Sequence, residues 1–380
     1  MFFYIGEACP LKSLSEVEPG VYLDQGWRGC MVNDKVAWYK GYSTECTVSD
    51  SVSAILNGYQ PVGKWCVISD KKVHHPVFRG FPLYRKGNGV ANVQVNGYHY
   101  VKYVLPDRNH TQDEITLDEA ATQIGDILLE NTQNFFKFNK IAQMNLLFTC
   151  GLDSMTSWAV LDHVTKEYTL EVYLPKGNDN TFHKFHGVIR EKQSDLIDFM
   201  AYHWGYNLTS DRLEENWHMT GFYAERIQLR EADHLNAIAN YYGKNIKTIT
   251  KPTDYLHWFC QRPATDAYLS TSLEFADERE LKEFCIASVY PDYQMWHLDN
   301  NFHFSPFFDI RITDVAARLS VKDILENGLN GLIQREIIRR FRPDFLQLLS
   351  PFKNEGDIFG NFRRNFQNIE LDPAVQVNIR

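Results

Sequence analysis

An apolar run that ends in a tight turn and continues as a helix constrains this chain more than any other stretch. Residues 146–154 read Leu-Leu-Phe-Thr-Cys-Gly-Leu-Asp-Ser, and apolar residues at helical spacing continue over 155–164. A strand, a turn at Gly151 and a helix start bring together unpaired N–H groups and the positive end of a helix dipole, which makes an anion site. Asp153 would repel a bare phosphate, so the pattern predicts a bridging Mg²⁺ ion. The same residues also fit an ordinary strand-to-helix turn with Ser154 as its cap.

The first hundred residues are a succession of short strand-like runs. Four of these runs are rich in apolar and aromatic residues, namely 2–5, 36–39, 65–68 and 81–84. Asn96-Gly97 predicts a hairpin between strands at 94–96 and 99–103, because this dipeptide favours two-residue turns. The polar segment 106–115 is typical of a linker. We therefore expect a mainly β domain over 1–105.

After the linker the spacing of apolar residues becomes helical. Thr116 and Glu119 form a capping box at the start of a helix. The strands expected beyond it are 145–149, 168–174, 206–209 and 246–250, and the helices expected between them are 154–165, 194–203 and 233–242. Such alternation predicts a parallel, doubly wound sheet that binds ligands at the carboxyl ends of its strands. We therefore expect an α/β domain over 116–380, mostly helical after 255 and with an arginine-rich helix near its end.

Composition and charge exclude several classes of protein. The net charge of -9 and the pI of about 5.8 argue against an extended phosphate-binding surface, so nucleic acid is not an expected partner. The seven cysteines are scattered and form no Cys-x-x-Cys pair, which argues against a disulfide framework or a structural zinc site. No apolar run approaches membrane-spanning length, and the N-terminus has no basic leader. We expect a cytoplasmic protein without membrane attachment.

The turn that follows residue 148 resembles the Ser-Gly-Gly-x-Asp-Ser pyrophosphate loop of ATP-dependent adenylating synthetases. Its residues are Thr149, Cys150, Gly151, Leu152, Asp153 and Ser154. Thr149 stands where the loop has Ser, and Cys150 stands where it has the first Gly, so that a β-carbon restricts the backbone there. Loops of this kind occur in asparagine synthetases, NAD synthetases and tRNA-thiolating enzymes. The loop therefore implies a class of chemistry and leaves the substrate open.

Other segments resemble asparagine synthetases and their relatives, the β-lactam synthetases and the lasso-peptide cyclases. In chain order they are 81–84 (Phe-Pro-Leu-Tyr), 170–172 (Leu-Glu-Val), 305–309 (Ser-Pro-Phe-Phe-Asp), 335–343 and 351–353 (Pro-Phe-Lys). This resemblance implies an adenine nucleotide α-hydrolase-like synthetase domain with a parallel, doubly wound sheet. It also implies a smaller, Ntn-hydrolase-like β domain, related to glutaminases, in front of it.

The resemblance assigns roles to individual residues. It implies that ATP is bound by Phe148, Thr149, Cys150, Gly151, Leu152, Asp153, Ser154 and Val172. Asp153 and Asp254 would hold Mg²⁺, and Lys353 would be the catalytic residue that offsets the charge developing on pyrophosphate. Lys353 also fits a solvated surface lysine. A solvated helix face is the simpler interpretation of Arg335, Arg339, Arg340 and Arg342. For His303 the simpler interpretation is a histidine in the core or at its rim.

Departures from the family pattern narrow the expected reaction. A glutaminase of this family needs a cysteine whose own α-amine serves as the base, but position 2 is Phe, which normally prevents removal of Met1. Cys9 has neither that amine nor that position, so we expect no glutamine hydrolysis. The family's Gly-x-Gly-x-Asp-Glu turn is replaced by 251–254 (Lys-Pro-Thr-Asp), and its Glu-x-Arg by 302–304 (Phe-His-Phe). The acceptor site is therefore expected to differ from that of asparagine synthetase.

Together these features imply an ATP- and Mg²⁺-dependent carbon–nitrogen ligase. It would adenylate a small-molecule or peptide carboxylate and transfer it to an amine or ammonia, with a homodimer left open as its assembly. Two alternatives remain. One is a non-catalytic, nucleotide-binding relative of asparagine synthetase, and the other is a ligase that modifies a nucleotide or nucleic acid.

Overall fold

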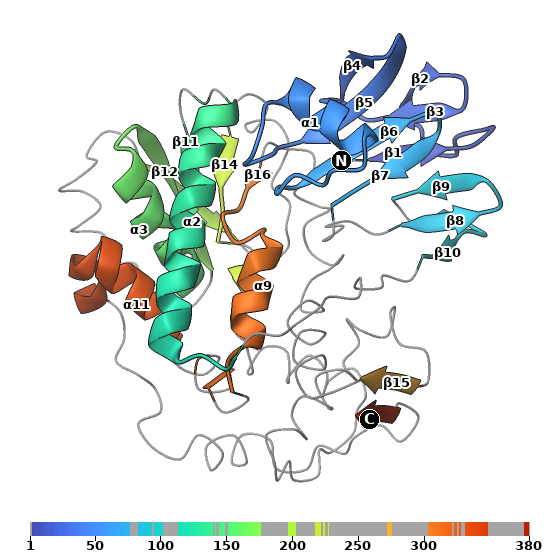
Figure 1. Ribbon diagram of the computed structural model, residues 1–380. Helices are drawn as coiled ribbons and strands as arrows, with labels where there is room; N and C mark the ends of the chain where they lie inside the picture. Colours follow the sequence, from blue (N-terminus) through green and yellow to red (C-terminus); the bar gives the residue numbers. More distant parts are fainter. Residues whose placement is uncertain are drawn as a thin grey trace. The chain divides into compact units, whose positions relative to one another are not determined.

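The computed structural model describes a large part of the chain (Figure 1). The described residues are 2–76, 83–92, 95–101, 113–139, 141, 144–148, 151–175, 197–202, 217–221, 223–224, 227, 272–275, 303–320, 323–324, 327, 331–348 and 376–379. The chain divides into two compact units: Met1–Tyr103, Leu128–Gly221 and Pro291–Ile310 make unit 1, and Val104–Ile127, Phe222–Tyr290 and Arg311–Arg380 make unit 2. A domain boundary at 105, with a linker over 106–115, stays a prediction. Within the described ranges, no helix combines the length and the apolar character that crossing a bilayer requires.

The N-terminal part of unit 1 consists of two antiparallel sheets. Their strands are β1 (Phe3–Ile5), β2 (Ser15–Glu18), β3 (Val21–Leu23), β4 (Arg28–Val32), β5 (Lys35–Gly41), β6 (Trp65–Ser69), β7 (Lys72–His74), β8 (Tyr84–Lys86), β9 (Gly89–Ala91) and β10 (His99–Tyr100). One sheet has the order β10-β8-β9-β1-β3-β2 and the other has the order β4-β5-β6-β7. The strands expected at 2–5, 36–39 and 65–68 are confirmed as β1, β5 and β6.

Apolar side chains fill the space between these two sheets and continue under a helix. Phe3 and Ile5 of β1 share one buried cluster with Cys66 and Ile68 of β6, so the sheets face each other. The opposite face of the β4-β5-β6-β7 sheet packs against helix α1 (Val48–Leu56), with Tyr39 among the buried side chains. All residues of β6 are buried, and alternate residues join different clusters, Cys66 and Ile68 one and Trp65 and Val67 the other, as the period of two in a β-strand dictates.

The hairpin expected around Asn96-Gly97 is only partly confirmed. Gly97 has a φ of 78°, and the Tyr98 N–H donates to the Val95 carbonyl at 3.0 Å, so a tight turn does form. Residues 95–96 are not a strand, however, and β10 pairs with β8 instead. The strand that competes for β10 comes from further back in the chain, which a local turn signal cannot foresee.

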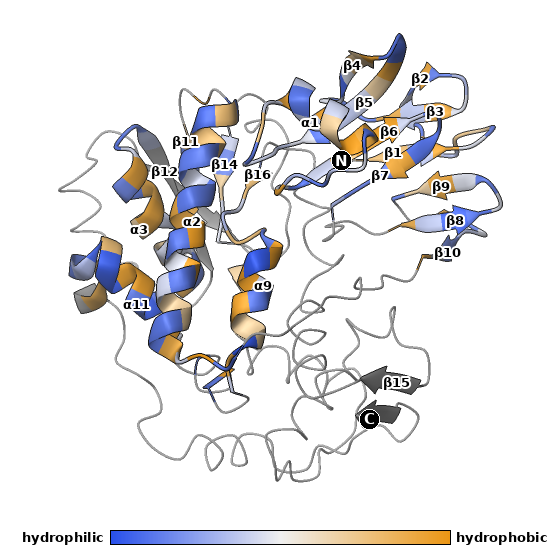
Figure 2. Ribbon diagram, viewed as in Figure 1, coloured by the Kyte–Doolittle hydropathy of each residue, from blue (hydrophilic) through white to orange (hydrophobic). Residues whose placement is uncertain are grey.

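A five-stranded parallel sheet forms the second part of unit 1. Its strands are β11 (Met144–Phe148), β12 (Tyr168–Pro175), β13 (Ile197–Tyr202), β14 (Trp217–Met219) and β16 (His303–Phe304), in the order β13-β12-β11-β14-β16. Helices α2 (Leu117–Asn139) and α3 (Leu152–Val164) lie on one face of the sheet. Phe135 of α2 stacks on Phe304 with a centroid distance of 4.0 Å, and Trp158 of α3 meets Phe148 at 5.0 Å. Along α2, hydrophilic and hydrophobic residues alternate as expected for a helix with one buried face (Figure 2).

The strands and the helix predicted around the turn at Gly151 are confirmed, and the helix predicted over 194–203 is wrong. Strands at 145–149 and 168–174 and the helix at 154–165 correspond to β11, β12 and α3. The helix expected over 194–203 is instead strand β13, which pairs with β12 from Leu170↔Ile197 to Pro175↔Tyr202. Its β-branched and aromatic residues suit a strand once such a partner is present, so pairing overrides the helical spacing. The elements expected at 206–209, 233–242 and 246–250 lie outside the described residues, and the doubly wound fold class stays a prediction.

A loop of the antiparallel part is anchored to the parallel sheet within unit 1. Tyr42, directly after β5, packs its ring against Phe135, Trp217 and Phe304 at centroid distances of 5.3, 6.0 and 5.3 Å. Its hydroxyl donates to the Ser305 carbonyl at 3.2 Å. These buried contacts join the two sheet systems of this unit through one aromatic side chain.

Unit 2 contains the start of α2 and most of the described C-terminal elements. Its further elements are most of α9 (Ile310–Ala317), together with α11 (Leu332–Phe341), the 3₁₀ turn η4 (Pro343–Leu348) and the paired strands β15 (Ser272–Phe275) and β17 (Gln376–Ile379). The capping box is confirmed: the Thr116 N–H donates to Glu119 Oε2 at 2.9 Å, and the Glu119 N–H donates to Thr116 Oγ1 at 3.2 Å. The arginine-rich helix is confirmed as α11, in which Arg340 pairs with Asp126 at 2.6 Å. The described segments after 255 thus combine helices with short strands.

Candidate functional site

The strand order of the parallel sheet marks one place where a ligand is favoured. From β11 the chain adds β12 and then β13 on one side, and it later adds β14 and β16 on the other side. In open parallel sheets ligands bind outside the carboxyl ends of the strands, at the point where the strand order reverses. That point lies between β11 and β14. The segments that follow these two strands are therefore the candidate site.

The segment after β11 begins helix α3 at Gly151. Gly151 is the N-cap residue, and its carbonyl accepts the first helical hydrogen bond from the Met155 N–H at 3.0 Å. Because the N-cap residue is a glycine, it offers no side chain to cap this helix start. Ser154 is inside the helix, and its hydroxyl donates to the Gly151 carbonyl at 2.9 Å. The interpretation of Ser154 as the cap is therefore wrong, because Gly151 is the N-cap residue and Ser154 lies in the first turn of the helix.

The segment after β14 approaches this helix start closely at Gly221. A β-carbon placed on Gly221 would lie 2.6 Å from the Asp153 carbonyl carbon and 2.7 Å from the Ser154 nitrogen. The approach is held by the Ser157 hydroxyl, which donates to the Thr220 carbonyl at 3.2 Å. Any side chain at position 221 would thus collide with the backbone of the first turn of α3, so only glycine permits this close packing. This glycine was not predicted as part of the site, although it lies two residues after the short strand 217–219.

Asp153 places a carboxylate in the first turn of α3. Its residue is 9% exposed, and neighbouring Ser154 is 4% exposed. A negative charge is stabilised at the positive end of a helix dipole, which explains why a carboxylate is tolerated in so closed a position. The described ranges contain no group of three His, Cys, Asp or Glu side chains that could hold a metal ion. Asp153 alone would leave most positions around a Mg²⁺ ion to other oxygen donors.

Some of the remaining predicted site residues lie at the carboxyl edge of the sheet, and others lie outside the described residues. Phe148 ends β11 with its ring buried against Trp158, so its backbone is the part at the carboxyl edge. Val172 is the register partner of Phe148 on β12, which puts both at the same level of the sheet. Gly151, Leu152, Asp153 and Ser154 make the turn and the helix start. Thr149, Cys150, Asp254 and Lys353 lie outside the described residues.

The segment 305–309, which resembles a family signature, is tied into the core. Asp309 is 1% exposed, and its Oδ2 accepts from Asn131 Nδ2 of α2 at 3.0 Å. The same amide nitrogen donates to the Pro306 carbonyl at 3.0 Å. Because a buried carboxylate needs such partners, Asn131 and Asp309 fix the entry to α9.

A row of polar side chains crosses the parallel sheet below the candidate site. Asn145, His218 and His303 are register neighbours on β11, β14 and β16, and the two imidazole centroids are 5.6 Å apart. Asn145 Nδ2 is 3.3 Å from His218 Nε2. Burial, together with the charges of His218 and Lys64, lowers the pKa of His303 well below its usual value. His303 is thus a neutral core histidine near pH 7, as the simpler interpretation of the sequence predicts.

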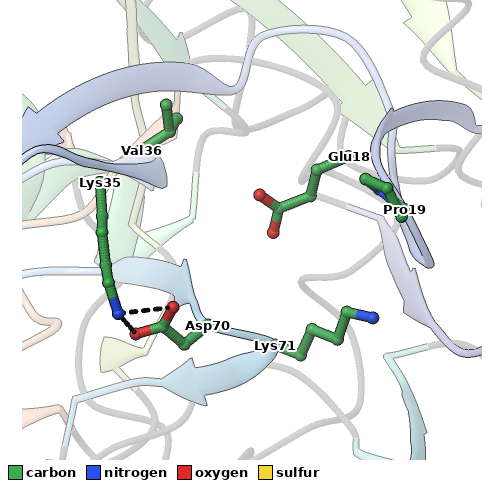
Figure 3. Close-up of a pocket in the computed structure, with 6 residues that line it drawn as sticks. All are labelled: Glu18, Pro19, Lys35, Val36, Asp70 and Lys71. Atoms are coloured by element: carbon green, nitrogen blue, oxygen red, sulfur yellow. Dashed lines mark hydrogen bonds and ion pairs between the residues drawn. The ribbon is translucent and has the colours of Figure 1, made fainter.

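A separate pocket lies at the tips of three hairpins in the antiparallel part of unit 1 (Figure 3). It measures about 420 Å³ and is lined by Glu18, Pro19, Lys35, Val36, Asp70 and Lys71. Lys35 donates to Asp70 at 2.9 Å, and both side chains are mostly exposed. An exposed ion pair contributes at most about 1 kcal/mol, so this pocket is weakly organised compared with the start of α3.

Neither a scan against models of protein families nor a search of curated proteins finds a match to this chain. Any function therefore has to follow from the residues and their geometry.

Proposed function

We propose that the chain is an ATP-dependent amide-forming synthetase that acts without glutaminase activity. The observation that carries this proposal is the helix start that follows β11: α3 begins at Gly151, at the carboxyl edge of the sheet where the strand order reverses. A helix start at this edge suits phosphate oxygens, because its N–H groups point toward such a ligand and the dipole favours negative charge. Asp153 in the same turn favours a phosphate that arrives with a divalent cation.

The chain's own residues divide the work of binding. The backbone of Gly151, Leu152 and Ser154 would hold the phosphates of ATP, with Thr149 and Cys150 completing the loop. Phe148 and Val172, at one level of neighbouring strands, would offer backbone groups to the adenine. Asp153 and Asp254 would hold Mg²⁺, which neutralises phosphate charge when it is bound.

The proposed reaction has two steps. A carboxylate oxygen of the substrate attacks the α-phosphorus of ATP, the bond to the β-phosphate oxygen breaks, and pyrophosphate leaves. Lys353 offsets the charge that develops on the departing oxygen. An amine or ammonia then attacks the carbonyl carbon of the acyl-adenylate, its nitrogen loses a proton to solvent, an amide forms and AMP leaves with the bonding electron pair. Acceptor-dependent pyrophosphate release tests this function against a protein that binds the nucleotide without turnover.

Asp153 is expected to make nucleotide binding dependent on Mg²⁺. Replacing Asp153 with Asn should lower the affinity for ATP in the presence of Mg²⁺ by about 10- to 100-fold, the range seen when an oriented partner of a metal site is removed. Isothermal titration with ATP, with Mg²⁺ and with EDTA, measures the effect. Glu167→Gln is the matched control, since this exposed carboxylate follows the far end of α3. Equal affinities for wild type and Asp153→Asn under both conditions would place the nucleotide elsewhere.

Cys9 is expected to be inert toward glutamine. Burial raises the pKa of its thiol, and Sγ donates to the Leu11 carbonyl at 3.6 Å, so the group is held as a thiol and is a poor nucleophile. Purified protein should therefore release no glutamate from glutamine, and Cys9→Ala should give the same background. Glutamate release that persists through purification and disappears in Cys9→Ala would overturn this expectation.

A further inference from the structure

The pocket at the hairpin tips of the antiparallel part is bordered by three two-residue turns. Pro19-Gly20 joins β2 to β3, Asn33-Asp34 joins β4 to β5, and Asp70-Lys71 joins β6 to β7. Gly20 has a φ of 79°, and both residues of the other two turns have φ between 49° and 61°. Positive φ values of this kind close tight turns between paired strands, so the backbone around the pocket is fixed by the two sheets.

Glu18 and Lys71 are charged residues of this pocket whose side chains are not paired with each other. Neither side chain forms a hydrogen bond or an ion pair with another described residue, whereas Lys35 and Asp70 bind each other at 2.9 Å. The Glu18 carboxylate extends into the space between the turns, and Lys71 borders that space from below (Figure 3). Lys71 Nζ would lie 3.4 Å from a β-carbon on Gly20, so its ammonium is beside the β2–β3 turn. A carboxylate and an ammonium from different hairpins are thus available to one ligand.

An exposed apolar surface adjoins these charges and provides an independent observation. Val36 and Pro19 line the pocket, and Val36 is the register partner of Met31 across β4 and β5. Residues directly opposite each other on two strands have their side chains on the same face of the sheet. Met31 is 68% exposed and Val36 is 39% exposed, and Tyr59 is the other large hydrophobic residue that is exposed in the described part of the chain. An apolar group held at the pocket would cover this surface.

We propose that this pocket binds a free apolar α-amino acid. Glu18 would accept hydrogen bonds from the ammonium group of the ligand, Lys71 would donate to its carboxylate, and its side chain would lie on Val36. A purely anionic ligand would be repelled by Glu18, and a purely cationic ligand would be repelled by Lys71, so the two charges favour a ligand that carries both. The flexible four-carbon stem of Lys71 lets its ammonium move toward the ligand. A volume of about 420 Å³ is within the range of small-molecule sites.

Ligand-observed NMR on the full-length protein tests this proposal with L-leucine as the probe. Because the charges of the pocket are close to solvent, we expect a dissociation constant of about 1 mM. N-acetyl-L-leucine lacks the ammonium, L-leucinamide lacks the carboxylate and glycine lacks the apolar side chain. Each of these three should bind at least about tenfold more weakly than L-leucine, since one part of the pocket is left without its match. No binding of L-leucine at about 10 mM, or equal binding of all four compounds, would overturn the proposal.

Two variants assign the binding to this pocket. Glu18→Gln and Lys71→Gln should each weaken the binding of L-leucine at least about tenfold, because each removes a hydrogen bond to a charged group. Lys72→Gln is the matched control: Lys72 is exposed and follows Lys71 directly, but it does not line the pocket, so binding should stay at the wild-type level. Wild-type affinity in both Glu18→Gln and Lys71→Gln would place L-leucine elsewhere and refute the proposal. The titrations contain no ATP, so their outcome is independent of the proposed synthetase activity.

Discussion

Replacing Lys353 with Ala is expected to lower pyrophosphate release by about 100- to 1,000-fold while ATP affinity stays at the wild-type level. The magnitude is that of losing one electrostatic contact to charge that develops in a transition state. Such contacts change turnover rather than ground-state binding. The measurement is pyrophosphate release with a carboxylate that supports turnover, beside a separate ATP titration of the same variant.

Controls for Lys353 distinguish a catalytic ammonium from a surface charge. Lys353→Arg should recover only part of the activity, because a planar guanidinium does not replace a compact ammonium. Lys166→Ala removes a lysine whose side chain is 73% exposed and should leave pyrophosphate release unchanged. If wild type turns over and Lys353→Ala is equally fast, Lys353 is a surface lysine.

Replacing Gly221 with Ala is expected to disrupt both stability and nucleotide binding. The new β-carbon would lie under 3.0 Å from backbone atoms of Asp153 and Ser154, which cannot rotate away as the end of a side chain could. Overpacking of this kind costs about 1–3 kcal/mol, and the shift it forces would displace the first-turn N–H groups. Thermal unfolding and ATP titration together measure the two effects.

Gly125 provides the matched control for Gly221. A β-carbon on Gly125, in the middle of α2, would meet nothing closer than 3.4 Å, and its nearest neighbour is the flexible guanidinium of Arg340. Gly125→Ala should therefore be neutral or stabilise the protein by up to about 1 kcal/mol through helix propensity. A Gly221→Ala protein with wild-type stability and ATP affinity would show that the close approach to α3 has no role in the site.

The elements predicted well are those whose signals are local. The capping box of Thr116 and Glu119 and the strand, turn and helix around Gly151 depend on residues within a few positions of each other, and all are present. The helix predicted over 194–203 was wrong, because strand β13 forms there by pairing with β12, about 27 residues earlier in the chain. The close approach of Gly221 to Asp153 was missed for the same reason, since 68 residues separate them and the crossover that joins them leaves no local pattern.

Because Tyr42 packs against the parallel sheet, the antiparallel part of unit 1 contributes to the stability of that sheet. Removing the N-terminal strands would take away a ring that covers Phe135, Trp217 and Phe304, together with the hydroxyl bonded to Ser305. Asn139 would also lose its hydrogen bond to the Ser43 carbonyl, at 3.0 Å. These aromatic side chains at the edge of the parallel sheet would then be exposed to solvent, and an exposed apolar patch favours aggregation. Deletion of the antiparallel part should therefore lower the solubility and stability of the remainder, whether or not this part performs any chemistry.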